Sequence, residues 1–123
     1  MGREMNSETK QLRQRTKSLA IRVVRLYRSL PQAKDAQVIG THLLRSGTSV
    51  GANYRAVCRS RSKPEFVSKI GIVLEEADET VFWLELLQET GIIAAEKIGV
   101  LLQEAKELTA IFTASQRTAK GNA

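Results

Sequence analysis

The segment KDAQVIGTHLLRSGTSVGANYRAVCRSRS, residues 34–62, decides the fold of this chain of 123 residues. Positions three, four or seven residues apart form one potential buried helix face, namely Ala36, Leu43, Gly47, Val50, Tyr54, Val57 and Arg61. Residues 46–51 have poor helix propensity, with a cost of up to about 1 kcal/mol for each glycine, so a loop is the alternative there. The apolar phase before Ser46 agrees with the phase after Gly51. We therefore predict one continuous helix, whose small residues would let a neighbouring helix approach closely.

Three further stretches, residues 8–30, 64–90 and 94–118, have the same helical periodicity. In the helix over residues 8–30 the buried face would consist of Leu12, Thr16, Leu19, Val23, Leu26 and Leu30. In the helix over residues 64–90, the third along the chain, it would consist of Phe66, Ile70, Val73, Ala77, Val81, Leu84 and Gln88. In the helix over residues 94–118, the fourth, it would consist of Ile98, Leu101, Leu102, Ala105, Leu108 and Phe112. Four long helices with short connections predict an all-α, single-domain, antiparallel up-down-up-down four-helix bundle. We expect residues 1–7 to be disordered and residues 119–123 to be frayed.

Helix boundaries have recognisable signals in this sequence. Ser7 is the expected cap of the first helix, and Pro31 ends that helix because proline cannot donate the next backbone hydrogen bond. Ser62 and Pro64 mark the start of the third helix. Gly91 is its expected C-terminal cap.

Charge is distributed unevenly along the chain, whose formal net charge is +6. Residues 1–69 hold 15 basic and 4 acidic side chains, whereas residues 70–123 hold 4 basic and 9 acidic ones. This asymmetry favours an anionic partner, contact between oppositely charged surfaces, or both. No apolar run approaches the roughly 18 to 20 residues of a membrane span, and the start of the chain does not resemble a signal peptide. With one cysteine and no disulfide framework, we expect a cytoplasmic protein with no membrane partner.

Seven cationic residues lie on helix faces that point away from the predicted core: Arg15, Arg22, Arg25, Arg45, Arg55, Arg59 and Lys63. Small residues between those of the second helix, Thr48, Ala52 and Ala56, would not obstruct an approaching nucleic-acid backbone. Arginine can bind two phosphate oxygens at once. The pattern predicts salt-dependent, weakly sequence-specific binding of RNA or DNA. The alternative is a solvated face, or ion pairs with the acidic half of the chain.

The third helix is apolar on more than one side. Phe82, Trp83 and Leu86 point away from its main stripe, and Leu87 lies at the edge. Large aromatic side chains are typical interface anchors, so we predict a homo-oligomer interface at these four residues. The alternative is that helix four covers them. The nearby acids Glu75, Glu76, Asp78 and Glu79 are expected to pair with the basic helices of a neighbouring subunit.

The sequence contains few residue patterns that indicate catalysis. His42 and Cys58 are 16 residues apart on one predicted helix, which separates them by about 24 Å and excludes a catalytic dyad within one subunit. We interpret His42 as a polar flanking residue and Cys58 as a small buried one. The carboxylates of Glu75, Glu76 and Glu79 lack the histidines of a di-iron bundle, so a metal-dependent enzyme is the least favoured class. We expect no enzyme activity, no cofactor and no metal.

The stretch LLRSGTSVGANYRAVCRSRSKPEFVSKIGIVLEEADETVFWLELLQETGII, residues 43–93, resembles the four-helix bundle family of 23S rRNA intervening-sequence proteins, the S23 family. The segment EAKELTAIFTAS, residues 104–115, continues the match, and the whole resemblance covers about residues 19–115. It implies a ring-like homopentamer without catalytic residues or cofactor. The family includes accessory variability proteins of diversity-generating retroelements, which bind a reverse transcriptase and nucleic acid through basic surfaces.

Carried over to this sequence, the resemblance implies that Arg45, Arg55 and Arg59 are the matching basic positions. After Asn53 many members read Ile-Ala-Glu-Gly, whereas this chain reads Tyr-Arg-Ala-Val at residues 54–57. Arg55 makes this face more basic and favours an anionic partner. The expected function is nucleic-acid binding by a homo-oligomer, as an accessory to a nucleic-acid enzyme such as a reverse transcriptase. The alternative is a protein-interaction scaffold with no nucleic-acid role.

Overall fold

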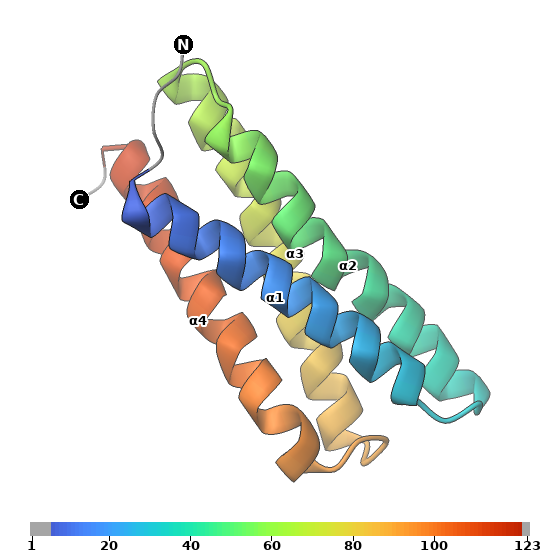
Figure 1. Cartoon of the computed structure of the whole chain (residues 1–123). Coiled ribbons are helices and arrows are strands. Elements are labelled where there is room, and N and C mark those ends of the chain that lie inside the picture. The colour runs from blue at the N-terminus through green and yellow to red at the C-terminus, as the bar shows by residue number, and fades with distance from the viewer. Residues whose placement is uncertain (1–5, 122–123) are drawn as a thin grey trace.

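The computed structural model describes residues 6–121, which form four helices and no strand (Figure 1). The helices are α1 (Ser7–Ser29), α2 (Lys34–Cys58), α3 (Lys63–Glu89) and α4 (Ala95–Ala119). The all-α, single-domain prediction is confirmed for these residues. Most of the predicted disordered start, residues 1–5, lies outside the described residues, and so do residues 122–123 of the predicted frayed tail. Ser7 and Ala119 belong to helices.

The segment of poor helix propensity is helical, as predicted, because α2 runs without a break through residues 46–51. Its hydroxyl groups turn back onto the helix: the Thr48 hydroxyl donates to the carbonyl of Leu44 at 2.7 Å, and the Ser49 hydroxyl donates to the carbonyl of Arg45 at 2.7 Å. These bonds satisfy side chains that would otherwise favour turns. The helix ends at Cys58, four residues before its predicted end, so Arg61 lies beyond it and is exposed.

Glycines on α2 permit α1 to pack closely along it. A Cβ atom at Gly47 would lie 2.7 Å from Cγ2 of Val23, and one at Gly51 would lie 3.2 Å from the carbonyl oxygen of Thr16. As residue numbers rise along α2, those of its partners on α1 fall, so the two helices run in opposite directions. The close approach predicted from the small residues of this segment is confirmed.

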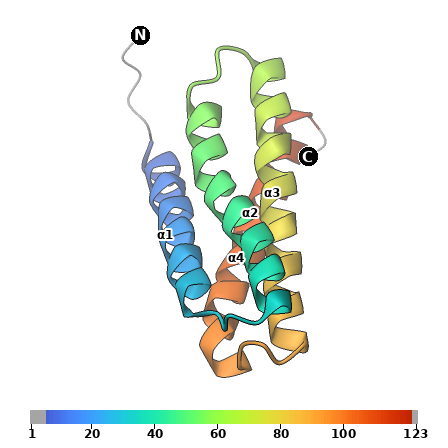
Figure 2. The same cartoon turned by 90° about the vertical axis from the view of Figure 1, so that its right-hand side faces the viewer.

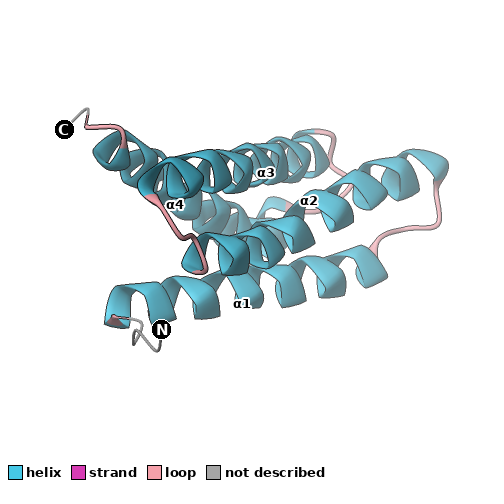
Figure 3. Ribbon diagram, turned by 90° about the horizontal axis from the view of Figure 1, so that it is seen from above, coloured by secondary structure: helices cyan, strands magenta, loops and turns pink. Residues whose placement is uncertain are grey.

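Each helix packs mainly on its neighbour in the chain. α2 contacts both α1 and α3, and α3 also contacts α4, whereas the contact between α1 and α4 is the least extensive of those present. Figure 2 shows the α1–α2 and α3–α4 connections at one end of the molecule and the α2–α3 connection at the other. Seen from above in Figure 3, α1 lies on the outside of α2. One side of α1 therefore forms a long seam with α2.

The helix boundaries follow capping chemistry, with one correction. Asn6, and not Ser7, caps α1, because its side chain accepts a hydrogen bond from the backbone N–H of Thr9 at 2.8 Å. Ser62 caps α3 as predicted and accepts from the N–H of Glu65. Gly91 has a φ of 77°, the left-handed conformation that ends helices at glycine.

The predicted core faces of the first and fourth helices are confirmed apart from Leu26, which is half-buried. The predicted stripe of the third helix is partly wrong, since Phe66, Val81 and Gln88 are only half-buried. The buried α3 positions are Ile70, Val73, Ala77, Thr80, Leu84 and Leu87. The intervals between these buried positions alternate between three and four residues, which keeps them on one side of the helix. The predicted stripe contains two successive intervals of four residues, which move it sideways around the helix.

Among the described residues, none of the four helices combines the length and the apolarity that crossing a lipid bilayer requires.

Candidate nucleic-acid interface

Arg15 is held by α4 and does not point freely away from the bundle as predicted. Its Nε donates to Glu104 Oε2 at 2.9 Å and its Nη2 to Glu104 Oε1 at 2.7 Å, a two-pronged pair. Nη2 also lies 3.2 Å from Glu107 Oε1. Hydrogen bonding to Glu104 is the largest cause that raises the pKa of Arg15 above its usual value. The positive charge of Arg15 is therefore balanced within the chain.

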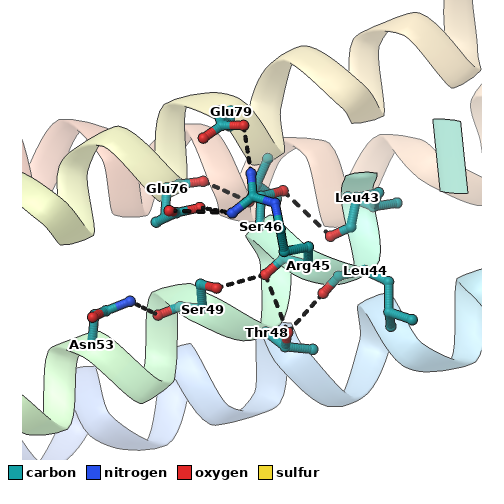
Figure 4. Close-up of polar contacts among 10 residues, drawn as sticks. Leu43, Leu44, Arg45, Ser46, Thr48, Ser49, Asn53, Glu76 and Glu79 are labelled. Atoms are coloured by element: carbon teal, nitrogen blue, oxygen red, sulfur yellow. Dashed lines mark hydrogen bonds and ion pairs between the residues drawn. The ribbon is translucent and has the colours of Figure 1, made fainter. Parts of the chain in front are cut away.

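Arg45 is balanced in the same way by acids of α3. Figure 4 shows its guanidinium between Glu76 and Glu79, with Nη1 at 3.1 Å from Glu76 Oε1 and Nη2 at 2.7 Å from Glu79 Oε1. Hydrogen bonding to Glu79 is the first cause that raises the pKa of Arg45. These two acids, expected to pair with a neighbouring subunit, thus pair with an arginine of their own chain. The sequence left such ion pairs with the acidic half of the chain as the alternative, because charge counts do not show which helices are adjacent.

Arg55, on α2, and Arg59, the residue that follows α2, line a groove of about 460 Å³ along the seam between α1 and α2. The lining consists of four cationic and four small residues: Arg13, Lys17, Arg55 and Arg59, with Ala20, Thr48, Gly51 and Ala52. No acidic side chain lines it, and among residues 6–121 no carboxylate forms an ion pair with Arg55 or Arg59. The groove is therefore a concentrated site of positive charge.

Local sequence explains how both walls of the groove become cationic. Arg13 and Lys17 are four residues apart on α1, and Arg55 and Arg59 are four apart at the end of α2, so each pair projects from one side of its helix. The floor is shallow because Gly51 packs against the backbone of Thr16. Like charges at this spacing cost about 0.2–0.5 kcal/mol per pair. A bound anion would relieve that repulsion.

Sequence reasoning found Arg55 and Arg59 but missed Arg13 and Lys17. The sequence does contain a pattern that indicates these two cations, because they share a helix face with Ala20 next to the predicted core stripe of the first helix. Only the pairing of α1 with α2 brings that face to the groove.

Three more predicted cations lie elsewhere. Arg22 is half-buried and Arg25 is exposed, and neither lines the groove, because both lie on the side of α1 away from α2. Lys63 is exposed and is the first residue of α3. The seven predicted cations therefore do not form one surface.

Cys58 and Tyr54 lie on α2 and do not line the groove, but the Cys58 thiol is within electrostatic reach of Arg13 and Arg59, which do. Burial raises the pKa of the half-buried Cys58 thiol, and the groove residues Arg13 and Arg59 partly offset this by favouring the thiolate. Burial also raises the pKa of Tyr54 to about 12. The prediction that Cys58 is a small buried residue is thus only partly confirmed.

An aromatic cluster occupies the outer face of α2 and α3. Trp83 stacks on His42 with ring centroids 4.5 Å apart and planes inclined by 12°, and Phe82 meets Trp83 edge-on at 4.8 Å. Phe82 is 53% exposed, whereas Trp83 and Leu86 are half-buried. The indole Nε1 of Trp83 is buried without a hydrogen-bond partner among residues 6–121. His42 of α2 thus supplies part of the cover of Trp83.

The prediction that Leu87 lies at the edge of this surface is wrong. Leu87 is fully buried in the core, in line with Leu84 and Thr80. The reason is the alternating row of α3, which turns Leu87 inward and leaves Leu86 half-buried. Within the described part of the chain, no group of three His, Cys, Asp or Glu side chains is arranged to hold a metal ion.

Comparison with known proteins places these features in a family. Residues 8–114 match the family described as 23S rRNA-intervening sequence protein. A crystal structure at 1.70 Å of a protein with unknown function, from the S23 ribosomal protein family of Bacteroides thetaiotaomicron VPI-5482, is 33% identical to this chain with a TM-score of 0.79. The similarity covers 86% of this chain and 98% of that protein. No curated protein matches this chain. The chain belongs to the 23S rRNA-intervening sequence protein family.

Proposed function

We propose that this protein binds nucleic acid through the cationic residues of the α1–α2 seam and acts by binding and not by catalysis. The observation that carries the proposal is the groove itself, in which four cationic side chains converge with no acid among its lining residues. Phosphate contacts of this kind give affinity with little sequence preference. The one histidine and the one cysteine, both on α2, are about 24 Å apart by helix rise and do not form a catalytic pair.

The test of this proposal is fluorescence anisotropy with labelled RNA and DNA oligonucleotides over a range of salt concentrations. Four phosphate contacts predict that log K falls with log salt with a slope of about −2.8 for a single strand. Arg55→Gln/Arg59→Gln is expected to weaken binding by about tenfold for each charge-assisted hydrogen bond to phosphate that it removes. Arg22→Gln/Arg25→Gln removes the same charge from the far side of α1 and is the matched control. Equal weakening in both variants, or affinity independent of salt, would contradict the proposal.

The proposed biological role is an accessory to a nucleic-acid enzyme such as a reverse transcriptase, as the resemblance implies. A reverse transcriptase gene beside the gene for this chain would support that role. Pull-down of the neighbouring enzyme with and without added nuclease would show whether the two proteins associate directly or through nucleic acid.

We also propose that the protein associates with itself through the aromatic surface formed by Val38, His42, Phe82, Trp83 and Leu86. Val38 and Phe82 are 51% and 53% exposed, and Trp83 lies between Phe82 and His42. Exposed aromatic groups of this kind are common at the centre of interfaces. The resemblance to the family implies five copies.

Light scattering coupled to size-exclusion chromatography tests the assembly. The native chain is expected to form an oligomer, and Phe82→Ser is expected to shift it towards the monomer. Val100→Ser, at a site on α4 that is 73% exposed, is the control and should leave the mass unchanged. A native chain that is monomeric at micromolar concentrations would overturn this second proposal.

A further inference from the structure

The α1–α2 groove has the shape and charge of a site for a chain of phosphates. Its cations face each other from two helices, and its floor consists of small side chains that leave room above them. Successive cations on one wall, such as Arg55 and Arg59, are one helical turn apart, about 6 Å along the axis. Cations at that spacing can each meet a different phosphate of the same strand.

The lining also indicates which part of a nucleic acid would enter the groove. The described residues that line it include no aromatic side chain, so the groove offers no platform on which bases could stack. None of these lining residues is an asparagine, glutamine, aspartate or glutamate, the side chains that pair with adenine or cytosine edges. The four cations bind phosphate oxygens, and guanine is the base whose edge arginine and lysine also bind.

We propose that the groove seats consecutive phosphates of one strand, with Arg55 and Arg59 on one side, Arg13 and Lys17 on the other, and the bases pointing away from the protein. This inference rests on the proposed function and specifies its site and its ligand, the sugar-phosphate backbone. Free polyphosphates carry the same chemistry and are the second source of ligand to be distinguished.

Cys58 offers a direct readout of the groove, because it is the only cysteine of the chain and its thiol senses the charges of Arg13 and Arg59. Thiol reagents such as the anionic 5,5′-dithiobis(2-nitrobenzoate) react with the thiolate. A phosphate chain in the groove would offset the charges of Arg13 and Arg59 that favour the thiolate and would repel the anionic reagent, so the reaction of Cys58 should slow several-fold. Free N-acetylcysteine in the same solutions controls for ionic strength.

Three probes identify the ligand: a ten-residue deoxythymidine oligonucleotide, a base-free sugar-phosphate strand of the same length, and sodium tripolyphosphate. The proposal predicts that the first two protect Cys58 at similar concentrations and that tripolyphosphate protects it more weakly. If the base-free strand binds more than about tenfold more weakly than the oligonucleotide, the bases supply over about 1.4 kcal/mol and the proposed orientation is wrong. If tripolyphosphate alone protects, the groove is a polyphosphate site and the nucleic-acid function fails.

A variant that keeps every charge separates this site from diffuse attraction. Ala52 lines the groove and is exposed on α2, so Ala52→Leu fills the groove without affecting the core. It is expected to weaken oligonucleotide binding by about tenfold, because the added side chain would keep a phosphate from one of the cations. Ala114→Leu, at an exposed position on α4, is the matched control. If the oligonucleotide binds both variants as it binds the native chain and leaves Cys58 unprotected, the phosphates do not occupy the groove and this inference is wrong. Selective weakening by Arg55→Gln/Arg59→Gln would then still support nucleic-acid binding by the cations of the seam.

Discussion

Nη2 of Arg15 on α1 lies 2.7 Å from Oε1 of Glu104 on α4, and the Nε of the same guanidinium lies 2.9 Å from the second carboxylate oxygen. Both side chains are partly buried, at 27% and 19% exposure. This pair joins α1 and α4, whose contact is the least extensive among the helices that touch. Arg15, which the sequence predicted to bind nucleic acid, therefore makes a structural contact between α1 and α4.

We therefore expect Arg15→Gln to affect stability more than nucleic-acid binding. Removal of a partly buried, two-pronged ion pair should lower the free energy of unfolding by about 1 kcal/mol, and oligonucleotide affinity should stay within about twofold of the native value. Urea denaturation and anisotropy measure the two effects. Arg61→Gln is the control, because Arg61 is 87% exposed and its pair with Glu65 at 3.4 Å should contribute little to stability. A large drop in affinity in Arg15→Gln would place Arg15 in the interface after all.

Gly47→Ala tests the close contact between α1 and α2. Alanine raises helix propensity by about 1 kcal/mol, but its Cβ would lie 2.7 Å and 2.9 Å from the two methyl groups of Val23, and such overpacking costs about 1–3 kcal/mol. We expect a net decrease of stability in thermal and urea denaturation.

Gly99→Ala is the matched control for this change. It lies within α4, and no atom of a neighbouring element lies within 4 Å of a Cβ built there, so only the gain in propensity remains. Thermal denaturation should show a stabilised protein. Stabilisation of both variants would mean that α1 can move away from Gly47 at little cost.

The hydroxyls of Ser46 and Thr80 lie 3.1 Å apart in the core and link α2 to α3. Each is also within hydrogen-bonding distance of a carbonyl of its own helix, so neither is left without a partner when the other is removed. We expect Ser46→Ala and Thr80→Val to destabilise by about 1 kcal/mol each, with a coupling energy of about 0.5–1 kcal/mol in a double-mutant cycle. Thr113 is exposed on α4, so the stability changes of Thr80→Val and Thr113→Val should add up in the double variant. Strict additivity of Ser46 and Thr80 would show that their contact contributes nothing.

Tyr54 makes stability depend on alkaline pH. Its phenol ionises near pH 10 when the chain is unfolded, but burial raises the pKa to about 12 in the folded protein. Between these values the unfolded state binds fewer protons, so stability falls as the pH rises from about 10 to about 12, by up to about 3 kcal/mol. Urea denaturation of the native chain and of Tyr54→Phe at several pH values isolates this contribution. The difference between the two proteins should change across that range and be constant below about pH 9; a constant difference throughout would contradict the assignment.

The sequence by itself determined the secondary structure and most of the core. Apolar spacing predicted four helices with boundaries within a few residues of those observed, and phase agreement across residues 46–51 predicted that α2 is unbroken. It failed at Leu87, since a helical period near 3.6 lets two neighbouring rows of α3 fit almost equally well, and only packing selects one.

The tertiary structure alone decided which cations can meet a ligand. One sequence pattern described Arg15, Arg45 and Arg55 alike, as arginines away from an apolar stripe. Acids from α4 and α3 balance the first two, whereas Arg55 faces Arg13 and Lys17 across the α1–α2 seam. Periodicity gives the direction of a side chain from its own helix axis, but the charge it meets depends on which helix packs beside it.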